Sequence, residues 1–192
     1  DTLPLFSQIN LKRKAHLRDS KQLLNVKDCC HLLIWRGKLL FRFNDGKPVP
    51  YLIEKRTKFI KNLSNYIFLG EFENKNIVLW DMSHSREVLG NTDQIGSFND
   101  GEKNYHPDLP KGTYFCDLRN LLPILNTKYA NLCATAKGIY EWHKRVNFCQ
   151  SCGGKLSSEK AGWEKVCEKC NFKQFPRIDP VVIMLITKGN DI

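Results

Sequence analysis

The chain has 192 residues and a mass of 22.3 kDa, with 42% hydrophobic and 26% charged residues. This composition allows a buried core and excludes a disordered tail, and no apolar run is long enough to cross a bilayer. The formal net charge of +10 is uneven, because residues 1–65 carry 14 Lys and Arg against 5 Asp and Glu.

The basic first third has two interpretations. It could attract a polyphosphate or nucleic-acid backbone, or its basic residues could stand singly on solvated faces. The spacing favours the second interpretation, as at Lys38, Arg42, Lys47 and Lys55. Because the chain opens at Asp1 and not at Met, we expect a fragment or a processed chain.

The residues from 31 to 81 predict a sheet. Residues 32–35 and 39–43 are β-prone runs around a short glycine turn, which is typical of a hairpin. Residues 49–53 predict a short strand, and residues 66–72 are expected to pair with 77–81. Residues 90–112 are rich in Gly, Asn, Asp and Pro and predict a long loop, after which 114–118 could form one more strand.

An amphipathic helix is predicted for residues 127–145, because apolar residues recur there at steps of three and four. Thr127 or Asn126 can cap its start, and Gly138 weakens the helix without breaking its period.

Four cysteines follow the helix in two Cys-x-x-Cys pairs, separated by fourteen residues. This spacing predicts two opposed turns around one tetrahedral metal, with zinc favoured over iron and over four unligated thiols. The expected ligands are Cys149, Cys152, Cys167 and Cys170. They complete a tetrahedron, so His143 is interpreted as a helix-face residue and not as a fifth ligand.

The other four cysteines, Cys29, Cys30, Cys116 and Cys133, have no regular spacing. We therefore expect a reducing compartment, the cytoplasm, in place of a disulfide framework. Beyond the ribbon, the proline-led apolar run at 181–186 predicts the first, fully buried strand of another domain.

From Leu132 onward the sequence resembles the NADH pyrophosphatase family of Nudix hydrolases. The resemblance is carried by the helix, by the cysteine pairs with Gly153-Gly154, and by the run Phe175-Pro176-Arg177-Ile178-Asp179-Pro180 directly after them. Phe68-Leu69-Gly70-Glu71 and Asp117-Leu118-Arg119 are similar to sparse landmarks of that family's N-terminal domain.

The resemblance implies an α+β fold. Its parts would be an N-terminal Nudix-like mixed sheet in 1–126, a linking helix in 127–146, a zinc ribbon in 147–175, and the start of a truncated Nudix catalytic domain in 176–192. It also implies a homodimer.

The implied activity is hydrolysis of the pyrophosphate of NADH or NAD to AMP and nicotinamide mononucleotide, and in some members removal of the NAD cap from RNA. In this family a Nudix box, a helix with a Glu cluster, holds Mg²⁺ or Mn²⁺ to polarise phosphoryl oxygens and activate water. The 192 residues contain no Arg-Glu-x-x-Glu-Glu run. We therefore expect the chain alone to be inactive, with zinc in a structural role.

The resemblance also implies that Phe175 contacts the substrate, since an aromatic ring can stack on a base or on nicotinamide. Packing of Phe175 between the ribbon and the next domain is an equal alternative. Arg177 could neutralise phosphate, although pairing with Asp179 is favoured. Trp163 is expected in the core of the ribbon. Some relatives carry an acidic substrate contact just before this Trp, but here the residue is Gly162.

Two rival functions remain. The first is a nucleic-acid-binding ribbon, supported by the basic first third and by lysines around the cysteines, although three interleaved glutamates cancel part of their charge. The second is a dimerisation module without catalysis.

Overall fold

The structure is a computed structural model that describes residues 6, 10–19, 29–54, 60, 63, 66–98, 100–177, 183–184, 186 and 189. Its first part holds a short helical turn and six strands: η1 (Ala15–Leu17), β1 (Cys29–Trp35), β2 (Lys38–Asn44), β3 (Lys47–Pro50), β4 (Tyr66–Phe72), β5 (Lys75–Asp81) and β6 (Thr113–Cys116). The remainder holds α2 (Leu118–Leu121), α3 (Thr127–Arg145), β7 (Leu156–Glu159), η3 (Lys160–Gly162), β8 (Glu164–Cys167) and β9 (Lys173–Gln174).

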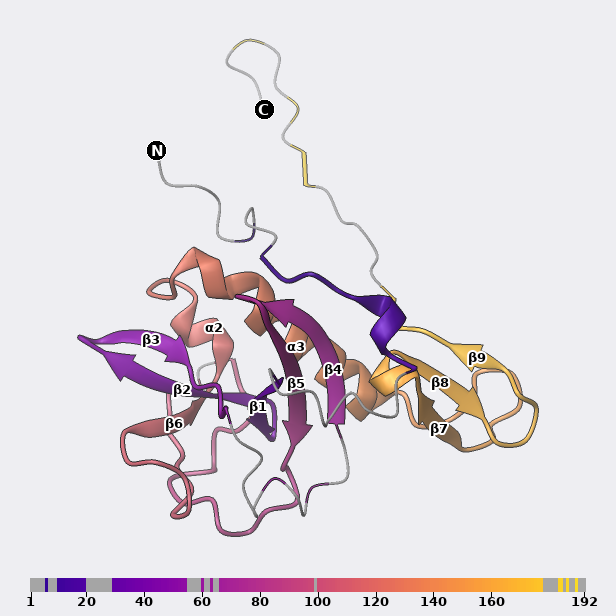
Figure 1. The fold of residues 1–192 in the computed structure, drawn as a ribbon, viewed down its shortest axis with the longest axis horizontal. Helices are drawn as coiled ribbons and strands as arrows, with labels where there is room; N and C mark the ends of the chain where they lie inside the picture. The colour runs from indigo at the N-terminus through magenta and orange to yellow at the C-terminus, as the bar shows by residue number, and fades with distance from the viewer. Residues whose placement is uncertain are drawn as a thin grey trace.

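The six-stranded sheet has the order β3-β2-β1-β5-β4, and β6 pairs with β2 (Figure 1). Both predicted pairings are confirmed, since β1 and β2 form an antiparallel hairpin and β4 pairs antiparallel with β5. The sheet is mixed, because β1 and β5 run parallel over six residue pairs. The strand expected at 114–118 ends earlier, at Cys116. There the Asp117 side chain accepts from the Arg119 amide and begins α2.

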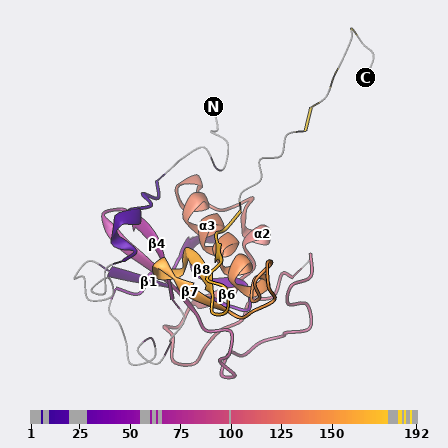
Figure 2. The same ribbon diagram turned by 90° about the vertical axis from the view of Figure 1, so that its right-hand side faces the viewer.

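The sheet is covered on both faces. All seven residues of β1 are buried, and alternate side chains enter two different cores because neighbouring strand residues point to opposite faces. The first core also holds the buried faces of α2 and α3, which lie together against the sheet (Figure 2). The second core is built around Trp35, Phe68, Trp80 and Phe115.

The predicted helix is confirmed as α3, with the Asn126 side chain accepting from the Lys128 amide at its start. Its buried residues are Ala130, Leu132, Cys133, Ala136, Ile139 and Tyr140, all of which belong to the first core. The helix therefore contributes to the sheet domain as well as leading to the ribbon.

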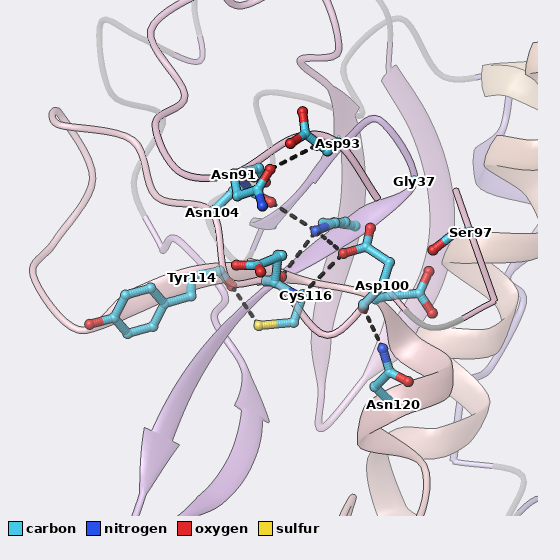
Figure 3. Close-up of polar contacts among 12 residues, drawn as sticks. Gly37, Asn91, Asp93, Ser97, Asp100, Asn104, Tyr114, Cys116 and Asn120 are labelled. Carbon is cyan, nitrogen blue, oxygen red and sulfur yellow. Dashed lines mark hydrogen bonds and ion pairs between the residues drawn. The ribbon is translucent and has the colours of Figure 1, made fainter. Parts of the chain in front are cut away.

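The basic residues of the first third were expected to stand singly on solvated faces, and for Lys38 this expectation is wrong. Its side chain is 1% exposed, and its Nζ contacts Asp100 Oδ1 at 2.6 Å, Asn104 Oδ1 at 2.8 Å and the Glu102 carbonyl at 3.0 Å. These acceptors use all three ammonium protons. They come from the predicted long loop, which Figure 3 shows around Asp100 and Asn104, so the loop is held to β2 by buried polar contacts.

The cysteine-bearing segment lies beside β4 and the C-terminal part of α3, at the opposite end of the molecule from β3 (Figure 1). Its three strands form an antiparallel sheet in the order β7-β8-β9. Trp163 was expected in the core of the ribbon, and this prediction was wrong. Its ring packs against the first core, and its Nε1 donates to the Phe68 carbonyl of β4. Gly162 explains the close approach, since a Cβ there would lie 2.8 Å from Ile67 Cγ1.

Most of residues 176–192, including the strand predicted at 181–186, lies outside the described residues. Of that run, Ile183, Met184 and Ile186 are described, and their side chains are exposed. In the described part of the chain, no helix combines the length and apolar character that a membrane span requires. None of the eight cysteines is in a disulfide.

Candidate metal centre

The four predicted cysteine ligands are brought together between the two knuckles of the ribbon. Their sulfurs all lie within 4.8 Å of one another. The separations are 3.3 Å for Cys152–Cys170, 3.4 Å for Cys152–Cys167 and 3.7 Å for Cys149–Cys170. Four thiolates about 2.3 Å from a tetrahedral zinc would stand about 3.8 Å apart. The donor set and its spacing therefore fit a metal of this kind.

The two knuckles have the same backbone hydrogen bonds, although their sequences differ. In the first, the amide of Gly153 donates to the Cys149 carbonyl at 2.9 Å, and in the second the amide of Asn171 donates to the Cys167 carbonyl at 3.0 Å. Asn171 has a φ of 57°, a left-handed conformation that asparagine tolerates better than most residues. This is why the second knuckle closes without a glycine.

Backbone amides also prepare Cys167 for metal binding. The amides of Cys170 and Lys169 point at Cys167 Sγ, at 3.5 and 3.4 Å, and hydrogen bonds from Cys170 and then Lys169 lower the pKa of this thiol to about 6. Gly154 leaves room for the sulfurs, because a Cβ there would lie 2.9 Å from Cys167 Sγ. A side chain at this position would intrude on the cluster.

His143 lies outside the cluster, in agreement with its interpretation as a helix-face residue. Its Nε2 is 2.7 Å from the Gly162 carbonyl, which can only accept, so Nε2 carries the proton. Burial lowers the pKa of His143, which favours this neutral form. The residue therefore links α3 to the ribbon.

Phe175 follows β9 on the ribbon surface, and its side chain is 55% exposed. Two other ribbon phenylalanines, Phe148 and Phe172, are 68% and 46% exposed. Exposed large aromatic rings are available for contact with a ligand or with another part of a protein. Arg177 is exposed, whereas its expected partner Asp179 lies outside the described residues.

A second group of potential metal ligands, Glu87, His106 and Asp108, was missed by the sequence analysis. The Asp108 amide donates to His106 Nδ1 at 3.1 Å, so the proton of a neutral ring is on Nε2, 3.1 Å from Glu87 Oε2. A metal at Nε2 would have to displace this proton. The contacts of His106 with Glu87 and Asp108 instead join two parts of the loop after β5. No regular residue spacing in the sequence predicts them.

Comparison with known proteins identifies the sheet domain. Residues 29–142, more than half of the chain, match the family described as the NADH pyrophosphatase-like rudimentary NUDIX domain. This stretch runs from the first residue of β1 nearly to the end of α3, and the four-cysteine ribbon follows it directly.

Curated relatives are similar over shorter stretches. Nudix hydrolase 19, chloroplastic, of Arabidopsis thaliana is 44% identical over 63 residues, which cover 31% of this chain and 14% of the relative. NAD-capped RNA hydrolase NudC of Mycobacterium tuberculosis is 34% identical over 85 residues, 44% of this chain and 26% of the relative. Human NAD(P)H pyrophosphatase NUDT13, mitochondrial, is 35% identical over 75 residues, 39% of this chain and 21% of the relative. The chain thus spans about a quarter or less of the length of these relatives.

Proposed function

The chain belongs to the NADH pyrophosphatase-like NUDIX family, and from this premise we propose that it is part of an NAD(H) diphosphatase. The proposed reaction is hydrolysis of the pyrophosphate of NADH or NAD to nicotinamide mononucleotide and AMP. NAD-capped RNA is proposed as a further substrate, because the mycobacterial relative is named for its action on it.

The observation that carries the proposal is the succession of two units along the chain. A sheet domain that matches the family over residues 29–142 is followed at once by a four-cysteine ribbon. The run that begins at Phe175 follows the ribbon, as expected for the link to a catalytic domain.

The two metals are proposed to have different roles. Zinc would be held by Cys149, Cys152, Cys167 and Cys170 and would stabilise the ribbon. Mg²⁺ or Mn²⁺ would be held by a Nudix box outside these 192 residues, where it would polarise phosphoryl oxygens and activate water.

The rival nucleic-acid-binding function is less well supported, because much of the ribbon's basic charge is already engaged. Lys160 contacts Asp19 at 2.7 Å, Lys173 contacts Glu164 at 2.9 Å, and Lys165 is buried with its Nζ on the carbonyls of His143 and Val146. A homodimer and a cytoplasmic location stay predictions.

Assays of the 192-residue chain and of a longer protein that includes a Nudix box test the proposed function directly. With Mg²⁺ or Mn²⁺, we expect the longer protein to release AMP and nicotinamide mononucleotide from NADH, whereas the 192-residue chain should release neither. Product detection by chromatography distinguishes the two. Turnover that scales with the concentration of the short chain would show that the active site has been misplaced.

Phe175→Ala in the longer protein tests the proposed substrate contact. If the ring stacks on the substrate, kcat/KM should fall by an amount equivalent to about 1–3 kcal/mol, the range for a base–aromatic stack, with zinc content and melting temperature nearly unchanged. If the ring packs between the ribbon and the catalytic domain, truncation should instead cost about 3–5 kcal/mol of stability.

Phe172→Ala is the matched control, because Phe172 is also a half-exposed ring on the ribbon. Its rate per folded molecule should stay at the parent value. An equal loss of rate in both variants, or no loss in Phe175→Ala, would remove the specific role of Phe175.

A further inference from the structure

A cleft of about 890 Å³ lies between the sheet domain, α3 and the ribbon. This volume is within the range of small-molecule sites. The cleft lies apart from the cysteine cluster, since none of the four cysteines lines it. Its walls come from the start of β4, the end of β5, the C-terminal part of α3, β7 and η3, so it exists only where the ribbon is docked on the sheet domain.

The inner end of the cleft is rich in hydrogen-bond acceptors. Ser83 Oγ donates its only proton to Asp81 Oδ1 at 2.5 Å, so the Tyr140 hydroxyl, 3.0 Å away, must donate to Ser83. With that proton engaged, the Tyr140 oxygen can only accept from a ligand, and the Asp81 carboxylate also only accepts. Tyr140 is 4% exposed and Asp81 is half-buried, so these acceptors belong to the wall of the cleft. A ligand that fits this end must offer donors such as hydroxyl groups.

The rim of the cleft offers positive charge. Arg18 and Lys144 line it, and neither has an ion-pair partner within the described part of the chain. Arg18 lies over the Trp163 ring at 4.2 Å and Arg13 over the same ring at 4.5 Å, so two guanidinium groups contact one ring. Arg18 Nε is buried without a hydrogen-bond partner in the described residues.

The acidic residues and the other lysines that line the cleft do not cancel the positive charge of Arg18 and Lys144. Asp19 is paired with Lys160, so these two charges offset each other, whereas Lys165 donates to backbone carbonyls and keeps its positive charge. Glu159 is exposed on β7 and opposes the field only in part. Burial and then the charge of Arg13 lower the pKa of Arg18, as expected for a cation that lacks a counter-ion.

We propose that the cleft binds a phosphorylated sugar, with the phosphate on Arg18 and Lys144 and the sugar hydroxyls on Asp81 and Tyr140. The acceptors Asp81 and Tyr140 and the cations Arg18 and Lys144 line the same cleft, and together they match a molecule that carries both hydroxyls and a phosphate. Free sugar phosphates and nucleotides share this chemistry. The proposal rests on residues of this chain alone and does not depend on the proposed function.

The test is titration of the zinc-loaded 192-residue chain with ribose 5-phosphate, AMP and inorganic phosphate, followed by calorimetry or amide chemical shifts. We expect ribose 5-phosphate to bind more tightly than inorganic phosphate. If the adenine base of AMP makes further contacts in the cleft, AMP should bind more tightly than ribose 5-phosphate. If the base makes none, the two should bind with equal affinity. Either result supports the proposal and identifies the source of the sugar phosphate.

Single substitutions test which side chains bind the phosphate of the ligand and which bind its sugar. Arg18→Gln and Lys144→Gln should each weaken binding of all three probes about tenfold, since each removes a charge-assisted hydrogen bond. Tyr140→Phe should weaken ribose 5-phosphate and AMP about fivefold without changing phosphate binding. Arg42→Gln, which removes a guanidinium stacked on Tyr51 away from the cleft, should change nothing.

The readout is independent of enzyme activity. Zinc content and melting temperature show whether Arg18→Gln has released the ribbon, and Lys144→Gln tests the rim without that risk, because Lys144 is exposed on α3. Failure of all three probes to bind would overturn the proposal. So would equal affinity for phosphate and ribose 5-phosphate, or unchanged binding in Lys144→Gln.

Discussion

Cys167→Ser is expected to abolish metal binding and to unfold residues 147–175 while the six-stranded sheet stays folded. The ribbon has a core of only three buried residues, Cys149, Leu156 and Cys167, and strands of two to four residues. Such a small unit cannot bury enough apolar area to be stable alone. Structural zinc supplies about 10–16 kcal/mol in isolated zinc-finger peptides, so losing a ligand removes most of the ribbon's stability.

Two measurements check this result. Elemental analysis should give one zinc per parent chain and none in the variant, and hydrogen exchange should show the amides of β7 and β8 losing protection while those of β1 and β5 keep it. Treatment of the parent chain with a chelator should give the same pattern.

Cys133→Ala is the matched control, because Cys133 is a fully buried thiol of the first core that is remote from the cluster. It should keep its zinc and its ribbon protection. Iron in the parent chain, or a protected ribbon without metal, would show that the structural role of zinc is wrong.

Features with a local signal were predicted well from the sequence. The hairpin of β1 and β2, the pairing of β4 with β5, the helix α3 and the four-cysteine cluster each depend on residue types at short, regular separations. The last strand of the sheet domain was predicted to end two residues too late, because the cap at Asp117 begins a helix too short to give a periodic pattern.

Features that depend on distant partners were not predicted. The parallel pairing of β1 with β5 joins residues 47 positions apart, as in Cys30 with Ile77, and no local pattern specifies it. Trp163 was placed in the ribbon's own core, whereas it packs on β4, 95 residues away. The cleft also depends on distant partners, since Asp81 ends β5, Tyr140 and Lys144 lie on α3, and Arg18 directly follows η1.

The buried ion pair of Lys38 and Asp100 also joins residues far apart in the sequence, and removing one partner is expected to destabilise the sheet domain strongly. Both side chains are 1% exposed, and Asp100 Oδ2 has no hydrogen-bond partner within the described residues. Lys38→Met would leave the carboxylate buried without a counter-ion. The expected loss in the free energy of unfolding is about 3–5 kcal/mol, as for other broken buried pairs.

Lys75→Met is the matched control, because Lys75 and Glu54 are joined at the same 2.6 Å but with side chains 47% and 70% exposed. Solvent screens such a pair, so its loss should cost only about 0–1 kcal/mol. The double variant Lys38→Met/Asp100→Leu should recover much of the stability lost in Lys38→Met, since it removes the stranded charge as well. Urea unfolding of the variants gives these differences directly. A Lys38→Met loss no greater than that of Lys75→Met would mean that the loop is held by its other contacts and not by this pair.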